Sequence, residues 1–135
     1  MKNSGSCLCG KVSFTVDKIL PSIAHCHCTM CQKFLGAAFS TFVEVKLSDL
    51  HWLTGEGNLQ SYRAENGTIR KFCRNCGSSL IFESKYNRQE KTTEIALASF
   101  DSISHVVPDA HIYTQTKVDW LVLNNNIPQY LGYRS

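Results

Sequence analysis

Seven cysteines in three short clusters constrain this chain of 135 residues more than any other feature. An odd number of cysteines cannot all pair as disulfides within one chain. Residues 1–6 lack the apolar run of a signal peptide, and no stretch approaches the roughly 18 apolar residues that span a membrane. The sequence therefore indicates a cytoplasmic protein, in which cysteines serve metal or redox chemistry rather than disulfide bonds.

Short runs of β-forming residues predict a mainly β fold. Val12, Phe14 and Val16 alternate with other residues, as in a half-buried strand. Further strands are expected at residues 37–45, 59–64, 69–73, 79–83 and 93–98, with a hairpin turn at Asn66-Gly67. Short helical segments are expected at 28–35, ending at Gly36, and as a turn at 101–105. The length suits a single domain over residues 1–135 with a sandwich or barrel-like core.

The motif Cys-x-x-Cys-Gly at residues 73–77 has the spacing of a metal-binding knuckle. Two intervening residues let both thiolates reach one ion, and the glycine permits a tight turn. Since a structural zinc needs four ligands, the Cys-x-Cys-Gly turn at residues 7–10 is the natural complement. The alternatives are scattered buried cysteines or a redox-active pair. The predicted ligands of a closed structural zinc site are Cys7, Cys9, Cys73 and Cys76.

The remaining cysteines, Cys26, Cys28 and Cys31, lie within one short segment. Three thiolates so close together can surround one ion, and a zinc with three protein ligands keeps its fourth position for water or substrate. The spacing predicts an open, catalytic zinc site. A second structural zinc completed by His25 or His27 remains an alternative, as does a supporting or purely structural role for these histidines.

The order of these motifs resembles the glutathione-dependent formaldehyde-activating family, which includes the centromere protein V group. The resemblance rests on C-x-C-G-x-V, C-H-C-x-x-C and F-C-x-x-C-G, on residues 36–40 (GAAFS) and 108–113 (PDAHIY), and on Gly55, Tyr62 and Trp120. It implies a β-tent-like fold, also seen in methionine-R-sulfoxide reductases. It also implies two zinc ions, one structural at the four-cysteine set and one at the three-cysteine set.

The family is named for joining glutathione to formaldehyde, which gives S-hydroxymethylglutathione, and is classed among carbon–sulfur lyases. The resemblance implies a zinc-dependent enzyme of this kind acting on glutathione or a related small thiol adduct. Because three cysteinate ligands weaken the Lewis acidity of zinc, the open zinc is expected to hold and orient a thiol. Residues 34–39 and 111–113 are candidate pocket walls. Candidates for binding the substrate's carboxylates are Lys33, Arg70, Lys71 and Arg74.

Three other functions compete with this interpretation. A non-catalytic zinc module could bind a protein partner, and the sequence does not exclude it. Binding of nucleic acid is disfavoured, because the net charge is only +3 and acidic residues interleave with the basic ones. A sulfoxide reductase would need a nucleophilic cysteine on a late strand, and no cysteine follows Cys76. The sequence leaves a homodimer open.

Overall fold

The computed structural model describes residues 3–134, so Met1, Lys2 and Ser135 lie outside the described residues. The chain divides into two compact units. The first comprises the described residues up to Pro21 together with Val43–Val106, and the second comprises Ser22–Phe42 together with the residues from Val107 onward. The prediction of one domain over residues 1–135 stays a prediction.

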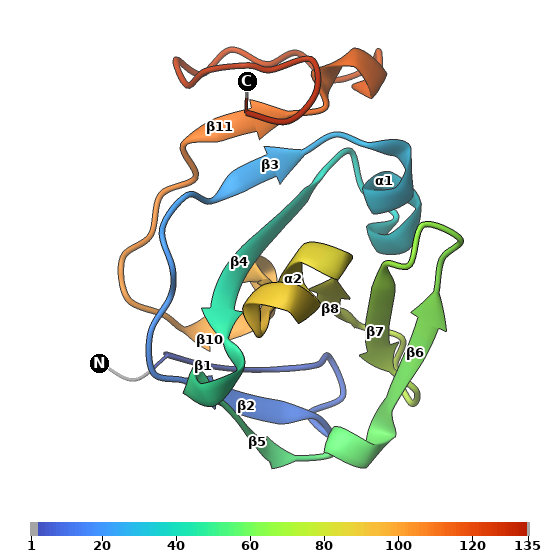
Figure 1. The fold of residues 1–135 in the computed structure, drawn as a ribbon, viewed down its shortest axis with the longest axis vertical. Coiled ribbons are helices and arrows are strands. Elements are labelled where there is room, and N and C mark those ends of the chain that lie inside the picture. The colour runs from blue at the N-terminus through green and yellow to red at the C-terminus, as the bar shows by residue number, and fades with distance from the viewer. Residues whose placement is uncertain (1–2, 135) are drawn as a thin grey trace. The chain divides into compact units, whose positions relative to one another are not determined.

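The first unit is built from antiparallel strands (Figure 1). One sheet has the order β10-β1-β2-β5. The ladder β9-β8-β7-β6 belongs to a second sheet. The bounds are β1 (Asn3–Ser6), β2 (Ser13–Val16), β5 (Leu50–Thr54), β6 (Leu59–Arg63), β7 (Ile69–Cys73), β8 (Ser79–Glu83), β9 (Thr92–Ala96) and β10 (Phe100–Ser102).

The core of the first unit centres on Phe14. Its ring is fully buried and makes edge-to-face contacts with Trp52 and Phe100, at centroid distances of 5.8 and 5.1 Å. Such aromatic pairs stabilise a core beyond the area that they bury. The other buried apolar residues of this unit include Val12, Val16, Val43, Val45, Leu80, Ile81 and Ile95.

The second unit holds the parallel pair β3 (Ala24–Cys26) and β11 (Ala110–Ile112), which lie side by side in Figure 1. The first residues of β4 (Ser40–Lys46) pair with β3, and the rest of β4 belongs to the first unit. Helix α1 (Thr29–Leu35) follows β3. Its caps are Cys28 and Gly36, the latter with a left-handed φ of 62°, so the predicted helix and its glycine cap are confirmed.

The mainly β, β-tent-like class with short helices is confirmed. Strands β7 and β8 have the predicted bounds, and the predicted hairpin turn joins β6 to β7. The helical turn expected at 101–105 is wrong, because Phe100–Ser102 forms β10 and pairs with β1. Helix α2 (Lys85–Glu90) was not predicted. The 3-10 turns are η1 (Leu47–Asp49), η2 (Glu56–Asn58), η3 (Leu97–Ser99) and η4 (Thr114–Thr116).

Among the helices of residues 3–134, none is long and apolar enough to cross a membrane.

Candidate metal centres

Two β-hairpin turns of the first unit carry the four-cysteine cluster. One turn joins β1 to β2 and contains Cys7 and Gly10, whose N–H donates to the Cys7 carbonyl at 3.1 Å. The other joins β7 to β8, and there the Gly77 N–H donates to the Cys73 carbonyl at 2.8 Å. Both glycines have left-handed φ angles, of 81° and 80°, which other residues adopt only at a cost. The two Cys-Gly motifs therefore form similar turns.

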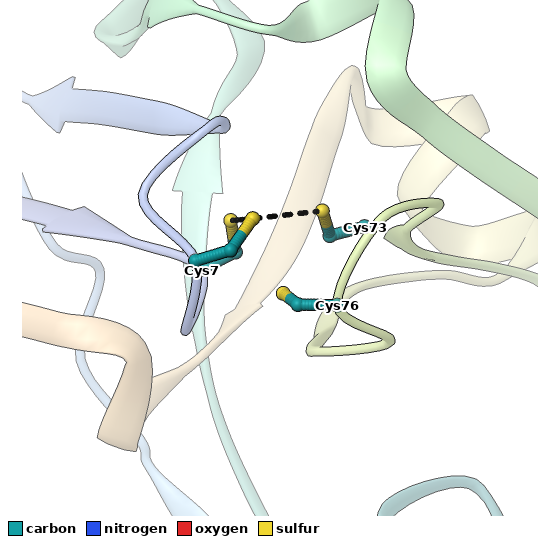
Figure 2. A group of neighbouring side chains, drawn as sticks. Cys7, Cys73 and Cys76 are labelled. Atoms are coloured by element: carbon teal, nitrogen blue, oxygen red, sulfur yellow. Dashed lines mark hydrogen bonds between the residues drawn. The ribbon is translucent and has the colours of Figure 1, made fainter.

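The four sulfur atoms of this cluster converge. All four Sγ atoms lie within 4.8 Å of one another, inside the limit of about 5 Å that a shared tetrahedral ion allows. The Sγ atoms of Cys7 and Cys9 are 3.6 Å apart, and those of Cys9 and Cys73 are 3.8 Å apart. Sulfurs bound tetrahedrally at about 2.3 Å are separated by roughly 3.8 Å. Figure 2 shows Cys7, Cys73 and Cys76 directed toward a common point, so the cluster could hold one metal ion.

Hydrogen bonds around Ser78 connect the two turns. The Leu8 N–H donates to Ser78 Oγ at 2.8 Å, and Ser78 Oγ lies 3.3 Å from the Cys76 sulfur. The hydrogen bond from Ser78 lowers the pKa of Cys76 to about 5, which favours the thiolate that a metal requires. Burial instead raises the pKa of Cys7 to about 11. A cation shared by the four sulfurs would offset that penalty.

The three-cysteine cluster lies where β3 passes into α1 in the second unit. Cys26 ends β3, Cys28 caps α1, and Cys31 lies in the first turn of the helix. The Cys31 N–H donates to the Cys28 sulfur at 3.4 Å. The three Sγ atoms lie within 4.8 Å of one another, so they could hold a metal ion. Hydrogen bonding with the other two thiols, and then burial, raise the pKa of Cys26, a penalty that a bound cation would also offset.

The backbone of His27, between two of these cysteines, is fixed by three hydrogen bonds. Its N–H donates to the Ile112 carbonyl in β11 at 2.9 Å. Its carbonyl accepts from Gln32 Nε2 of α1 at 2.8 Å and from Thr116 Oγ1 of η4 at 2.9 Å. Strand, helix and 3-10 turn therefore hold the loop that spaces the cysteines.

The side chains of His25 and His27 do not join the group of three sulfurs. His25 Nδ1 lies 2.6 Å from Thr41 Oγ1, and His27 Nε2 lies 2.9 Å from His111 Nδ1. His111 Nε2 in turn lies 3.1 Å from Asn125 Oδ1. His27 is fully buried, and burial followed by nearby positive groups lowers its pKa to about 4. These contacts give the histidines a packing role beside the cluster.

The two segments predicted as pocket walls meet each other. The Phe39 ring lies 4.8 Å from His25 and 5.0 Å from His27, centroid to centroid, and 6.3 Å from His111. Tyr113 follows His111 and Ile112 and has a left-handed backbone, with φ of 55°. Whether these segments line a substrate pocket stays a prediction.

Most of the basic residues proposed for substrate carboxylates belong to the first unit. Arg70 is only 4% exposed, and its guanidinium lies 5.0 Å from the centre of the Phe82 ring, so it packs within the first unit. Lys71 and Arg74 belong to the same unit. Only Lys33, exposed on α1, belongs to the unit of the three-cysteine cluster.

Sequence reasoning missed several residues that support this cluster. Gln32 and Thr116 fix the loop, and Asn125 meets His111. Lys117 Nζ donates to two main-chain carbonyls, at 2.9 and 2.6 Å. Their positions depend on the pairing of β3 with β11, for which the sequence gives no local signal.

Comparisons with known proteins place the chain in a family. A family model described as "Glutathione-dependent formaldehyde-activating enzyme" matches residues 2–116. An uncharacterized lyase of Schizosaccharomyces pombe is 25% identical over 115 residues, which are 85% of this chain and 80% of the relative. The crystal structure of a Rhodobacter sphaeroides protein superposes with a TM-score of 0.62 at 25% identity, covering 75% of this chain and 90% of that one.

Proposed function

The chain belongs to the glutathione-dependent formaldehyde-activating family, and on that premise we propose that it is a zinc-dependent carbon–sulfur lyase. Its substrate would be a glutathione-type thiol adduct, in the simplest case S-hydroxymethylglutathione. The family description names glutathione and formaldehyde, and the fission yeast relative is named a lyase. The proposal includes the cytoplasmic location that the sequence indicates. The link to the centromere protein V group stays a prediction.

The observation that carries the proposal is the difference between the two sulfur groups. Four sulfurs converge in the first unit, whereas three converge in the second, and no fourth ligand atom joins them among residues 3–134. Four protein ligands make a closed structural zinc, and three leave an exchangeable position. We assign the structural zinc to Cys7, Cys9, Cys73 and Cys76, and the catalytic zinc to Cys26, Cys28 and Cys31.

The reaction couples a thiol to an aldehyde. In the synthetic direction the thiolate sulfur attacks the aldehyde carbon, the carbonyl π pair moves to oxygen, and that oxygen takes up the proton that the thiol lost. In the lyase direction the same carbon–sulfur bond breaks. Zinc bound at the three-cysteine site would lower the pKa of a thiol held there.

The chain's own residues would hold and orient that thiol. Three cysteinates would surround the zinc with more negative charge than the ion carries. The zinc would therefore activate the aldehyde only weakly, which favours a role in holding the thiol. The hydrogen bonds that Gln32 and Thr116 donate to the His27 carbonyl would keep the spacing of the cysteines fixed during turnover. Cysteines held at fixed positions would place the bound thiol in one orientation. Orientation is a main source of rate enhancement when two reactants must meet.

Cobalt substitution tests this function. Cobalt-loaded protein is titrated with glutathione and with S-hydroxymethylglutathione while the sulfur-to-cobalt absorption bands are recorded. Glutathione should shift the bands directly, and S-hydroxymethylglutathione should shift them as cleavage of its carbon–sulfur bond releases the thiol. Cys28→Ser should abolish both responses. S-methylglutathione, which lacks a free thiol, is the matched control and should leave the bands unchanged. Bands that ignore millimolar thiol would remove the proposed function and favour a non-catalytic zinc module that binds a partner.

A further inference from the structure

The residue after β11 has an unusual backbone. Tyr113 has φ of 55° and ψ of 40°, the left-handed conformation that favours glycine. Three hydrogen bonds hold it there: its N–H donates to the Gly132 carbonyl at 2.7 Å, and its carbonyl accepts from the N–H and Oγ1 of Thr116, at 3.3 and 3.2 Å. A bulky residue held in this region is a reason to look for a function.

The pairing of β3 with β11 shows that the histidines and Cys26 lie on opposite faces of this pair of strands. His111 stands opposite His25, and Ile112 stands opposite Cys26. The rings of His25 and His27 each lie 5.0 Å from that of His111, so these three side chains gather on one face. Because successive side chains of a strand alternate, Cys26 points to the other face.

Continued as a strand, β11 would place Tyr113 on the face of His111. The left-handed backbone breaks this alternation. Burial and then the neighbouring thiols of Cys26 and Cys28 raise the pKa of the Tyr113 phenol. The backbone of Tyr113 adjoins the cysteine loop, because Ile112 directly before it pairs with Cys26 and accepts the His27 N–H at 2.9 Å. Its phenol O–H is a hydrogen-bond donor. Among the residues that the structure describes, the phenol has no hydrogen-bond partner.

We propose that Tyr113 is a catalytic residue whose phenol donates a hydrogen bond to the substrate oxygen at the three-cysteine site. The inference rests on the proposed function. That oxygen gains the carbonyl electron pair as the carbon–sulfur bond forms, and it gives the pair back as the bond breaks. The phenol keeps its own proton throughout, and the proton lost by the thiol reaches the oxygen through solvent. A donor aimed at developing negative charge stabilises the transition state more than the bound thiol.

The placement of Tyr113 is tested without measuring activity. In cobalt-loaded protein with ring-labelled tyrosine, the NMR signals of Tyr113 should be strongly shifted or broadened by the metal. Tyr113→Phe identifies the signals by their loss. Cys28→Ser, which removes the nearby metal, should return them to their diamagnetic positions. Zinc-loaded protein, in which the metal is diamagnetic, is the control in which the Tyr113 signals should stay sharp and unshifted.

The role of the phenol is tested by the kinetics of Tyr113→Phe, which removes only the O–H group. Exchange between glutathione and S-hydroxymethylglutathione, followed by NMR, should slow by roughly a hundredfold or more in kcat. Glutathione affinity, read from the cobalt bands, should stay within about twofold, because the lost contact belongs to the oxygen rather than the sulfur. Tyr133→Phe, at an exposed tyrosine of the same unit, should exchange at the wild-type rate.

The outcomes separate the two levels of the proposal. Wild-type turnover in Tyr113→Phe, or Tyr113 signals that cobalt does not affect, overturns the role of Tyr113 while the bands still report thiol binding. Equal losses of thiol affinity and turnover would likewise overturn it, since they indicate a damaged site. Cobalt bands that ignore thiols would remove the proposed function, and the role of Tyr113 with it.

Discussion

The two cysteine clusters differ in the length of chain that each one ties together. In the first unit, Cys9 and Cys73 are 64 positions apart, yet their sulfurs are 3.8 Å apart. In the second unit, Cys26, Cys28 and Cys31 come from the end of β3, the short loop after it and the start of α1. A metal that joins distant segments closes a long loop and stabilises the fold, whereas a metal held by one short segment cross-links little. The comparison suggests that the first cluster supports the fold and the second supports chemistry.

The largest expected effect comes from breaking the long-range cluster. Cys73→Ser should unfold the chain or cost several kcal/mol, a large share of the roughly 5–15 kcal/mol that stabilises a typical domain, because structural zinc contributes directly to folding. Cys9→Ser should behave in the same way. Thermal denaturation followed by circular dichroism measures the loss. A variant that melts with the wild type would show that the first metal does not support the fold.

Cys28→Ser should leave stability nearly unchanged while the protein loses one metal equivalent and its activity. Serine is a good N-cap, so it replaces the cysteine that now accepts the Cys31 N–H. Cys28→Ala is the matched variant: it loses the same metal and also the cap, which should cost about 1 kcal/mol more. Elemental analysis and melting curves measure both. Destabilisation equal to that of Cys73→Ser would remove the distinction between the clusters.

A glycine-to-alanine substitution can be made in the segment that carries each cluster. Gly77 (φ 80°) follows the second cysteine pair of the first cluster, and Gly36 (φ 62°) ends α1. A methyl group at either meets no atom within 4 Å, so alanine introduces backbone strain alone, of about 1 kcal/mol. Gly77→Ala should lower the melting temperature and the affinity of the four-cysteine cluster for its metal. Gly36→Ala should lower the affinity of the three-cysteine cluster for its metal. Competition with a chelator reads both affinities, and the opposite assignment would contradict the account.

A smaller effect is expected from Thr116→Val. The change removes the hydroxyl that the His27 and Tyr113 carbonyls share, while His27 still accepts from Gln32 and Tyr113 from the Thr116 N–H. A neutral hydrogen bond contributes about 1 kcal/mol, so affinity for the second metal should fall by no more than roughly tenfold, with no change at the first. Thr114→Val, in the same 3-10 turn, is the comparison: its hydroxyl donates to Tyr130 rather than to the cysteine loop. Equal effects of the two changes would show that the loop contact has no special role.

Much of the first cluster could be predicted from the sequence because its signals are local. Each Cys-Gly turn is recognisable by itself, and the runs of β-forming residues at 69–73 and 79–83 predict β7 and β8 with their observed bounds. What joined the two turns was the need of zinc for four ligands. Strand spacing alone could not show that their sulfurs meet.

The surroundings of the second cluster were hidden because they depend on tertiary pairing. Strands β3 and β11 have three residues each, too few to show a period, and they are far apart in the sequence. An arginine such as Arg70 is usually exposed at the surface, but Arg70 is buried and packs against the Phe82 ring. Helix α2 is polar and short, and its capping box of Ser84 and Asn87 lacks the usual glutamate.

The central claim is that one metal is closed by four sulfurs and the other is open with three. X-ray absorption counts the sulfurs around zinc before and after a mild chelator removes the weaker equivalent. The remaining metal should have four sulfur neighbours, the protein should stay folded, and glutathione should no longer bind. Loss of both metals together, or a remaining metal with three sulfur neighbours, would contradict the claim.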